Sequence, residues 1–157
     1  MIVLGIDPGV SGGIAFYDTR DPLVIRALDT PVVAGEVDVD SLVDIIISAK
    51  PDRAIIERVH SMPKQGVAST FKFGTAYGAV RATVVALRIP TTLVTPRVWK
   101  QRMGLNSEAE TSRARAIQRW PGAGCFTRKK DHNRAEAALL ALYAVEADAA
   151  PLLERAA

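Results

Sequence analysis

The order of the apolar segments near the amino terminus constrains the fold most strongly. Residues 2–6 and 13–17 are short apolar runs joined by a glycine-rich turn, and residues 23–28 add a third run of the same kind. Short apolar runs bounded by turn residues are typical of buried strands. This part of the chain therefore predicts three consecutive strands, with the third pairing next to the second.

A helix and a fourth strand follow these three strands. Asp40 or Ser41 can cap a helix that runs through Ala49, and residues 53–56 form another buried strand. A strand, a helix and a strand in succession imply a right-handed crossover and a parallel pair. The fourth strand can therefore lie alongside the first.

The rest of the chain alternates helices with one further strand. The expected elements are a helix over residues 70–87, a strand over residues 91–94, a short helix around Trp99, a helix from Asn106 or Ser107 to Arg119, and a helix over residues 131–149. With 157 residues and 48% hydrophobic content, the chain can bury one substantial core. We expect a single α/β domain over residues 1–150 and a frayed tail over residues 151–157.

Small residues recur along one side of the helix expected at residues 70–87. They fall four positions apart, at Gly74, Gly78, Ala82 and Ala86. A column of small side chains lets two backbones approach closely. Either the helix packs tightly on its own sheet, or it forms a twofold contact with a second copy of the chain.

The positive charge of the chain is concentrated in one segment. The net charge is only +3, yet ten of the twenty Lys and Arg residues lie between Arg97 and Arg134, against three acids. That segment therefore carries a local charge of about +7, and clustered positive charge suits a polyanion such as nucleic acid. The alternative is a solvated helix face with internal ion pairs.

Membrane and secreted proteins are not indicated by the sequence. It contains no stretch of 18 or more apolar residues, and its N-terminus lacks the basic leader and cleavage pattern of a secretory signal. The single Cys125 cannot form an internal disulfide, which fits a reducing compartment. We expect a cytoplasmic protein without a membrane partner, in the host-cell cytoplasm if a phage encodes it.

Three acidic residues stand where the predicted fold can bring them together. Asp7 ends the first strand, Glu57 ends the fourth, and Glu136 interrupts the apolar final helix. Ligand sites in open α/β sheets form at the carboxyl ends of strands, so parallel neighbours would place Asp7 beside Glu57. Two of these acids also have a simpler interpretation: Asp7 can form a turn, and Glu136 can pair with Arg134 or another base, or extend to solvent at the margin of the helix.

A cluster of these carboxylates predicts bound cations, because carboxylates packed together repel one another unless a cation neutralises them. A site of oxygen ligands suits Mg²⁺ or Mn²⁺ rather than Zn²⁺, and two such ions beside a basic surface favour hydrolysis of a phosphodiester. Asp131 and His132, at the start of the final helix, can add ligands. Asp131 can instead be an N-cap, and His132 a proton-transfer group or a surface residue.

Three segments of the chain carry a family resemblance: GIDPGVSGGIA at the start, IIERVH in the middle and DHNRAEAALLALYA near the end. In this order they resemble the RuvC family of Holliday-junction resolvases, particularly its compact phage-type members. The resemblance implies a ribonuclease-H-like fold, with a five-stranded mixed sheet and helices on both faces. It also implies a homodimer that binds a four-way DNA junction, each protomer nicking one strand.

The resemblance assigns roles to individual residues. Asp7 matches the first-strand aspartate of the family, Glu57 its fourth-strand glutamate, and Glu136 the last acid of the final helix. The helix over residues 70–87 looks like the one that builds the family's dimer interface.

One departure from the family pattern concerns the fourth metal ligand. Family members commonly carry an acid three residues before the last one, and this chain has Asn133 there. Asp131 or His132 would then complete the set of ligands.

The resemblance and the basic residues together nominate a DNA-binding surface. His60 and Met62 fall where family members place residues that probe the opened centre of the junction. The candidate phosphate contacts are Lys64, Lys72, Arg97, Lys100, Arg128, Lys129 and Lys130. Phosphate contacts release counterions, so we expect binding to weaken as the salt concentration rises.

Three other functions are compatible with parts of the sequence. An RNA-processing nuclease would share the fold and the carboxylates. The segment DPGVSGG resembles the phosphate-binding hairpin of actin-like ATPases, but the chain is too short for their two domains and has no Walker GK[ST] pattern, so we expect no nucleotide cofactor. A non-catalytic DNA-binding module would use the basic surface alone.

Overall fold

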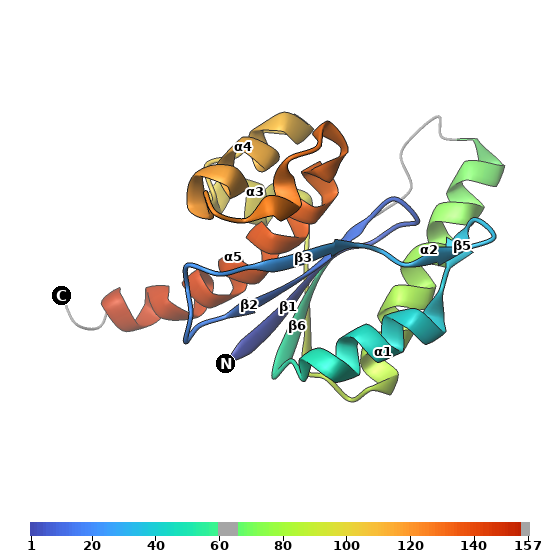
Figure 1. Cartoon of the computed structure of the whole chain (residues 1–157), viewed down its shortest axis with the longest axis horizontal. Coiled ribbons are helices and arrows are strands. Elements are labelled where there is room, and N and C mark those ends of the chain that lie inside the picture. Colours follow the sequence, from blue (N-terminus) through green and yellow to red (C-terminus); the bar gives the residue numbers. More distant parts are fainter. Residues whose placement is uncertain (60–65, 155–157) are drawn as a thin grey trace.

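A five-stranded mixed sheet forms the centre of the protein (Figure 1). The computed structural model describes residues 1–59 and 66–154. The sheet has the order β3-β2-β1-β6-β7, with β1 (Ile2–Asp7), β2 (Gly13–Asp18), β3 (Arg26–Asp29), β6 (Arg53–Glu57) and β7 (Thr91–Val94). The first three are antiparallel neighbours, whereas β6 and β7 run parallel to β1. The expected sheet, with the fourth predicted strand beside the first, is confirmed.

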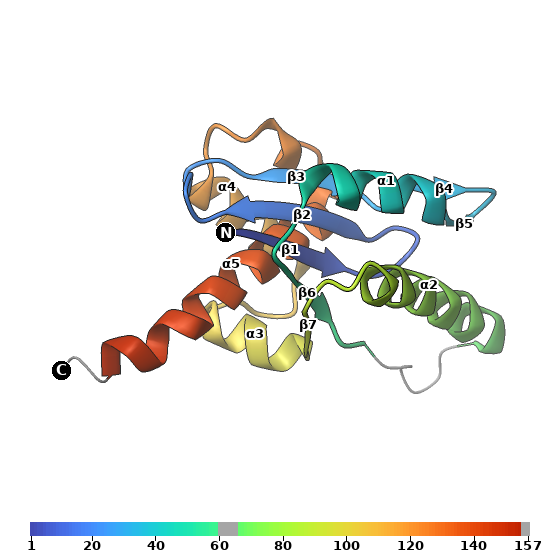
Figure 2. The ribbon, with the colours of Figure 1, turned by 90° about the horizontal axis from the view of Figure 1, so that it is seen from below.

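Helices cover both faces of this sheet, as Figures 1 and 2 show. One face carries α1 (Val39–Ala49) and α2 (Val67–Ala86). The other face carries α3 (Pro96–Arg102), α4 (Ala109–Arg119) and α5 (His132–Glu154), and α5 packs on β1 and β2. Two 3₁₀ turns, Gly124–Phe126 and Lys129–Asp131, lie between α4 and α5. Among the described residues, no helix combines the length and the apolar character that crossing a membrane requires.

Alternation along the central strand divides the core into two parts. Val3 packs in the core beneath α5, whereas Leu4 and Ile6 pack with α1 and α2, because successive side chains of a strand point to opposite faces. All three side chains are fully buried. Both faces of β1 are therefore closed, and only its end residues Ile2 and Asp7 are partly exposed.

Two glycines let α5 lie directly against the sheet. A side chain on Gly5 of β1 would overlap the carbonyl oxygen of Ala137, and one on Gly13 of β2 would lie 2.7 Å from the carbonyl carbon of Asn133. The α5 residues buried at this contact are largely alanines, namely Ala135, Ala137, Ala138 and Ala141. Because the backbones touch here, the first two turns of α5 reach the carboxyl end of β1.

The amino-terminal strands differ from the prediction in two places. The third strand begins at Arg26, three residues later than expected, because a hydrogen-bonded turn joins Asp21 to Val24. A small hairpin of β4 (Val32–Val33) and β5 (Glu36–Val37) follows it. Two-residue strands are too short to show any periodicity, so the hairpin has no recognisable sequence pattern.

Helix ends also differ by a few residues. Asp38, rather than Asp40 or Ser41, caps α1, and it accepts a hydrogen bond from the Ser41 N–H at 3.2 Å. The final helix continues to Glu154, so the part of the expected frayed tail that the structure describes is helical.

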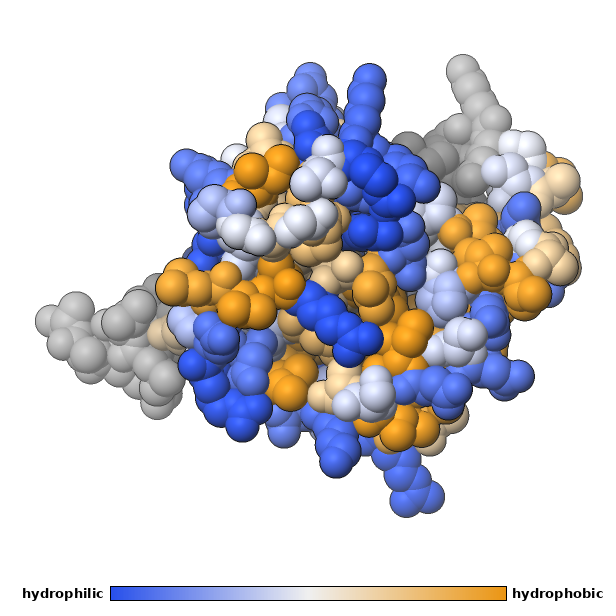
Figure 3. Space-filling view, viewed as in Figure 1, coloured by the Kyte–Doolittle hydropathy of each residue, from blue (hydrophilic) through white to orange (hydrophobic). Residues whose placement is uncertain are grey.

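The small residues of α2 do not face the sheet. The side of α2 that is buried carries Ala76, Val80, Thr83 and Val84, whereas the small column is exposed: Gly74, Gly78, Ala82 and Ala86. Among the described residues, no atom beyond the neighbouring backbone of α2 itself would lie within 4 Å of a Cβ added at Gly74 or Gly78. The interpretation that this column packs on the chain's own sheet is therefore wrong. Figure 3 shows apolar residues at the surface over α2 and the β4–β5 hairpin.

Candidate active site

Three acids from distant parts of the chain meet at the carboxyl ends of β1 and β6. Asp7 ends β1, Glu57 ends β6, and Glu136 lies in the second turn of α5. Each offers a carboxylate oxygen, and these oxygens all lie within 4.8 Å of one another. The parallel register of β1 and β6, which pairs Ile6 with Ile56, sets the first two acids side by side. The close contact of α5 with the sheet supplies the third.

The three carboxylates perturb one another. Burial raises the pKa of Asp7 well above its ordinary value, and the charges of Glu136 and Glu57 raise it further. The positive charge of Lys100 opposes this shift. Burial also raises the pKa of Glu57, which a hydrogen bond from Trp99 partly offsets. A cluster whose repulsion favours proton binding also favours other cations.

Trp99 orients Glu57, a role that sequence reasoning missed. The indole N–H of Trp99 donates a hydrogen bond to Oε1 of Glu57 at 2.7 Å, and the Trp99 side chain is fully buried. A buried indole requires an acceptor for its N–H. The sequence did contain a signal for this role. Trp99 lies in a short helix directly after a predicted strand, so it could have been expected near the strand ends that carry the acids.

Two donors from α3 and α4 hold Glu136. Lys100 Nζ lies 2.8 Å from Glu136 Oε1, and the Ser112 hydroxyl donates to the same oxygen at 3.0 Å. Lys100 was expected to contact a DNA phosphate, but its ammonium is on Glu136, with only 15% of the side chain exposed. The simpler interpretation of Glu136, a pair with Arg134 or another base, is met by Lys100, whereas Arg134 binds Asp29 instead.

Asp131 does not join the acidic cluster. Its carboxylate accepts hydrogen bonds from the Arg128 backbone N–H at 2.7 Å and from the Arg128 guanidinium at 2.8 Å. Burial opposes its ionisation, but the bonds from Arg128 outweigh this effect and lower its pKa. The residue is 1% exposed, so both oxygens are committed to this turn. The expectation that Asp131 is a metal ligand is corrected accordingly: it stabilises the entry into α5.

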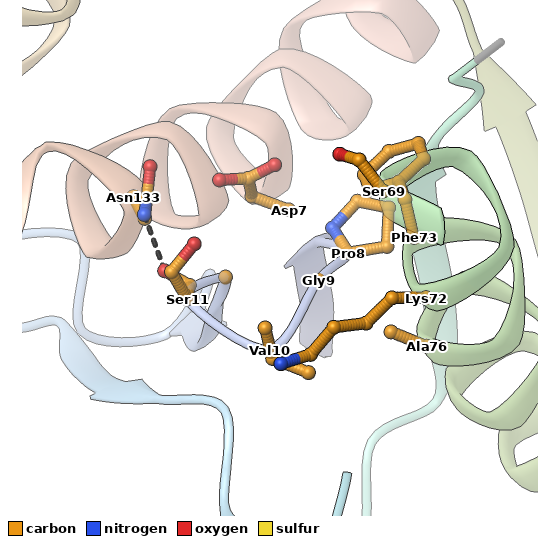
Figure 4. Close-up of a pocket in the computed structure, with 11 residues that line it drawn as sticks. Asp7, Pro8, Gly9, Val10, Ser11, Ser69, Lys72, Phe73, Ala76 and Asn133 are labelled. Carbon is orange, nitrogen blue, oxygen red and sulfur yellow. Dashed lines mark hydrogen bonds between the residues drawn. The ribbon is translucent and has the colours of Figure 1, made fainter. Parts of the chain in front are cut away.

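His132 and Asn133 form contacts with residues other than the three acids. Nδ1 of His132 lies 3.4 Å from the carbonyl oxygen of Lys129, and within the described chain His132 is not among the groups that could share an ion with the three acids. The Asn133 side chain donates a hydrogen bond to the carbonyl oxygen of Ser11, as Figure 4 shows. Asn133 therefore ties α5 to the β1–β2 turn.

A pocket of about 320 Å³ opens beside Asp7, between the β1–β2 turn and α2 (Figure 4). Its walls come from the turn, from α2 and from Asn133 of α5. Lys72, one of the candidate phosphate contacts, extends from α2 along this pocket, and Phe73 forms part of the same wall. The pocket thus has Asp7 at one end, and a lysine and a phenylalanine of α2 in its lining.

The basic residues divide into paired and unpaired ones. Arg128 binds both Asp29 and Asp131. In the portion of the chain that the structure describes, Arg97, Lys129 and Lys130 are exposed and form no ion pair. The three candidates of the loop after β6, His60, Met62 and Lys64, lie outside the described residues.

The donor set of the cluster fits a hard divalent cation. Three ionised carboxylates against one ammonium would leave two negative charges in a largely buried site. Among the described residues, donors reach only Oε1 of Glu57 and Oε1 of Glu136, and both oxygens of Asp7 are without one. Carboxylate oxygens without protein donors are the ligands that Mg²⁺ and Mn²⁺ prefer.

Comparison with known proteins decides which fold holds this site. No family model and no curated protein sequence matches the chain. RuvC of Thermus thermophilus in complex with a Holliday junction substrate aligns with a TM-score of 0.69 at 17% identity, covering 94% of this chain and 96% of that chain. The chain has the RuvC fold.

Two further structures support the same assignment. Fowlpox virus resolvase, in a complex with Holliday junction DNA, aligns with a TM-score of 0.52 at 15% identity, covering 94% of this chain and 98% of that chain. The yeast mitochondrial Holliday junction resolvase Ydc2 aligns with a TM-score of 0.51 at 15% identity, covering 90% of this chain and 76% of that chain. The resemblance to RuvC-type resolvases seen in the three sequence segments is therefore confirmed at the level of the fold.

Proposed function

We propose that this protein is a divalent-metal-dependent endonuclease that resolves four-way DNA junctions, or other branched DNA, by paired nicks. The observation that carries the proposal is the convergence of Asp7, Glu57 and Glu136 within 4.8 Å at the carboxyl ends of β1 and β6. Solved structures with the same fold are junction resolvases, two of them in complexes with Holliday junctions.

Asp7, Glu57 and Glu136 would hold the metal, Mg²⁺ or Mn²⁺, as two ions per site. When bound, the metal supplies a nucleophilic water of lowered pKa and positive charge for the leaving oxygen. The chain's own contribution is to keep the carboxylates in place. Trp99 restrains Glu57, and Ser112 restrains Glu136, so one oxygen of each glutamate is left for coordination.

The surface around the cluster suits a DNA backbone. The pocket beside Asp7, with Lys72 along one wall, has room for the sugar and phosphate next to the scissile bond. Exposed Arg97 in α3, and exposed Lys129 and Lys130 in the turn before α5, add positive charge on elements next to those that carry the cluster. Phosphate contacts of this kind give affinity that falls steeply with salt.

Paired nicks require two active sites, and α2 supports a homodimer. Its small column is exposed, and a Cβ added at Gly74 or Gly78 would meet no described atom within 4 Å beyond the neighbouring backbone of α2. Large apolar residues beside this column, Val67 and Phe71, are 88% and 77% exposed. A second copy of the same helix packed against this face would bury them.

The proposal is tested by cleavage of a mobile four-way junction, compared in one assay with a flap, a linear duplex and a structured RNA. We expect Mg²⁺-dependent paired nicks in the junction, no cleavage in EDTA, and none by Asp7→Asn. Faster cleavage of the RNA would instead favour an RNA-processing nuclease. Cleavage by Asp7→Asn at the wild-type rate would contradict the proposed site.

A further inference from the structure

Lys100 occupies a position inside the acidic cluster rather than on its rim. Its Nζ contacts Glu136 Oε1 at 2.8 Å, and 15% of the Lys100 side chain and 10% of the Glu136 side chain are exposed. Its charge also acts on Asp7 and Glu57, since it opposes the rise of the pKa of both. One ammonium thus offsets part of the charge of all three carboxylates.

We propose that Lys100 is a displaceable counter-ion: it offsets one of the negative charges of the cluster in the metal-free protein and leaves Glu136 when divalent ions bind. The inference rests on the metal site of the proposed function. It adds that metal binding is an exchange of one cation for another. An ion shared by three oxygens within 4.8 Å of one another would lie close to an ammonium 2.8 Å from one of those carboxylates. Like charges so close together in a largely buried site repel strongly.

Glu136 keeps its orientation when Lys100 leaves. The Ser112 hydroxyl, which is fully buried, donates to the same Oε1 at 3.0 Å from a different helix. Ser112 is uncharged, so it holds the carboxylate without competing with an ion. The two donors on one oxygen therefore have separate tasks, one electrostatic and one geometric.

A place for the released side chain lies next to the cluster. Lys100 also lines a groove of about 460 Å³, which Arg97, Gln101, Asn106 and Ser107 share. The lysine stem has four flexible carbons, so its ammonium can turn from the cluster to the groove. A DNA phosphate bound there would attract it.

Charge balance supports this exchange. With Lys100 on Glu136, the cluster retains two negative charges, which match one divalent ion. With Lys100 turned away and a scissile phosphate present, three carboxylates and one phosphate supply four negative charges, which match two. Departure of Lys100 therefore links loading of the second ion to arrival of the DNA.

The test is calorimetric titration of the full chain with Mn²⁺ alone at one fixed pH and ionic strength. We expect Lys100→Met to bind Mn²⁺ about tenfold more tightly than the wild type, because a charge-assisted bond no longer competes. Arg102→Met is the matched control, since it removes one positive charge from the exposed side of the same helix. We expect its Mn²⁺ affinity to stay within about twofold of the wild-type value, because salt screens the charge of an exposed side chain.

The outcomes separate this inference from the proposed function. Thermal unfolding in EDTA first confirms that Lys100→Met is folded, and Lys100→Gln provides a second variant without the charge. If the wild type binds Mn²⁺ and both variants bind it with the same or lower affinity, the exchange is overturned and the metal site stands. If the wild type does not bind Mn²⁺, both proposals are overturned.

Discussion

α5 and α2 are long helices on opposite faces of one sheet, yet they relate to it differently. The α5 backbone touches β1 and β2, and its residues from Ala135 to Ala141 are fully buried except Glu136, which is 8% exposed. α2 buries only one side and exposes Val67, Phe71 and Val85. The fully packed face holds the acids in place, and the partly covered face is the one on which we propose a second copy of the chain. The following changes test that division.

The largest effect is expected from Asp7→Asn in the packed face. We expect cleavage to fall at least about 10³-fold, because the cluster loses a metal ligand and its charge. The melting temperature in EDTA should rise by about 2–4 °C for each kcal/mol of repulsion removed, because ionised Asp7 is buried and repelled. Junction cleavage and calorimetry measure the two effects. Equal melting temperatures would contradict the repulsion.

A substitution in the partly covered face should prevent dimer formation without changing the acidic cluster. Gly78→Arg places a long charged side chain in the middle of the exposed small column, where we expect it to convert a dimer into a monomer. Sedimentation velocity measures the state, and junction cleavage should change from paired to single nicks. Gly122→Arg is the control, because that glycine is equally open and lies on the other side of the molecule, after α4.

The close contact of α5 with the sheet is tested by Gly5→Ala. A Cβ there would overlap the Ala137 carbonyl oxygen and lie 2.7 Å from the Ala141 nitrogen. We expect a loss of about 3 kcal/mol in the free energy of unfolding, since backbone must shift. Urea unfolding measures it, with Gly122→Ala as the control, expected within about 0.5 kcal/mol of wild type. Similar values for the two variants would show that α5 lies further from the sheet.

Asp131→Asn distinguishes the entry of α5 from the metal site. We expect it to cost about 1–3 kcal/mol of stability, because a buried carboxylate loses charge-assisted bonds from Arg128. Mn²⁺ affinity should stay near the wild-type value. A loss of Mn²⁺ binding as large as that of Asp7→Asn would return Asp131 to the set of ligands.

The smallest expected effect is a pH dependence of stability. Asp7 and Glu57 have raised pKa values in the folded protein, so the folded state binds more protons than the unfolded state between the ordinary and the raised pKa. Their contribution is favourable at low pH and is lost as pH rises through the raised pKa. The difference in melting temperature between Asp7→Asn and wild type in EDTA should therefore grow as pH rises. A difference independent of pH would contradict the shift of Asp7.

Sequence reasoning reached the sheet and the three converging acids because strand ends are visible in a sequence. Asp7 and Glu57 each close an apolar run, and parallel order makes them neighbours. The contacts between side chains of different elements were not visible. Lys100 looked like one of many basic residues, and only packing of α3 against α5 shows that it binds Glu136. The sequence suggested Asp131 as a metal ligand, and only the structure shows that Arg128 donates hydrogen bonds to its carboxylate.

For the partly covered face, which α2 forms, the sequence predicted two alternatives: packing on the chain's own sheet or contact with a second copy. The spacing of Gly74 and Gly78 indicated close helix contact but not which surface would provide it. The direction in which α2 turns its small column depends on which residues the sheet buries, and that is a property of the whole core. The β4–β5 hairpin was missed for the related reason that its pairing, not its sequence pattern, defines it.

The central claim is that Asp7, Glu57 and Glu136 together hold divalent metal. A crystal of the wild-type protein soaked in Mn²⁺, with data collected at a wavelength where manganese scatters anomalously, tests it most directly. We expect anomalous peaks in contact with all three carboxylates, and Lys100 Nζ more than about 4 Å from Glu136. Manganese bound elsewhere, with the three side chains in separate surroundings, would contradict the account.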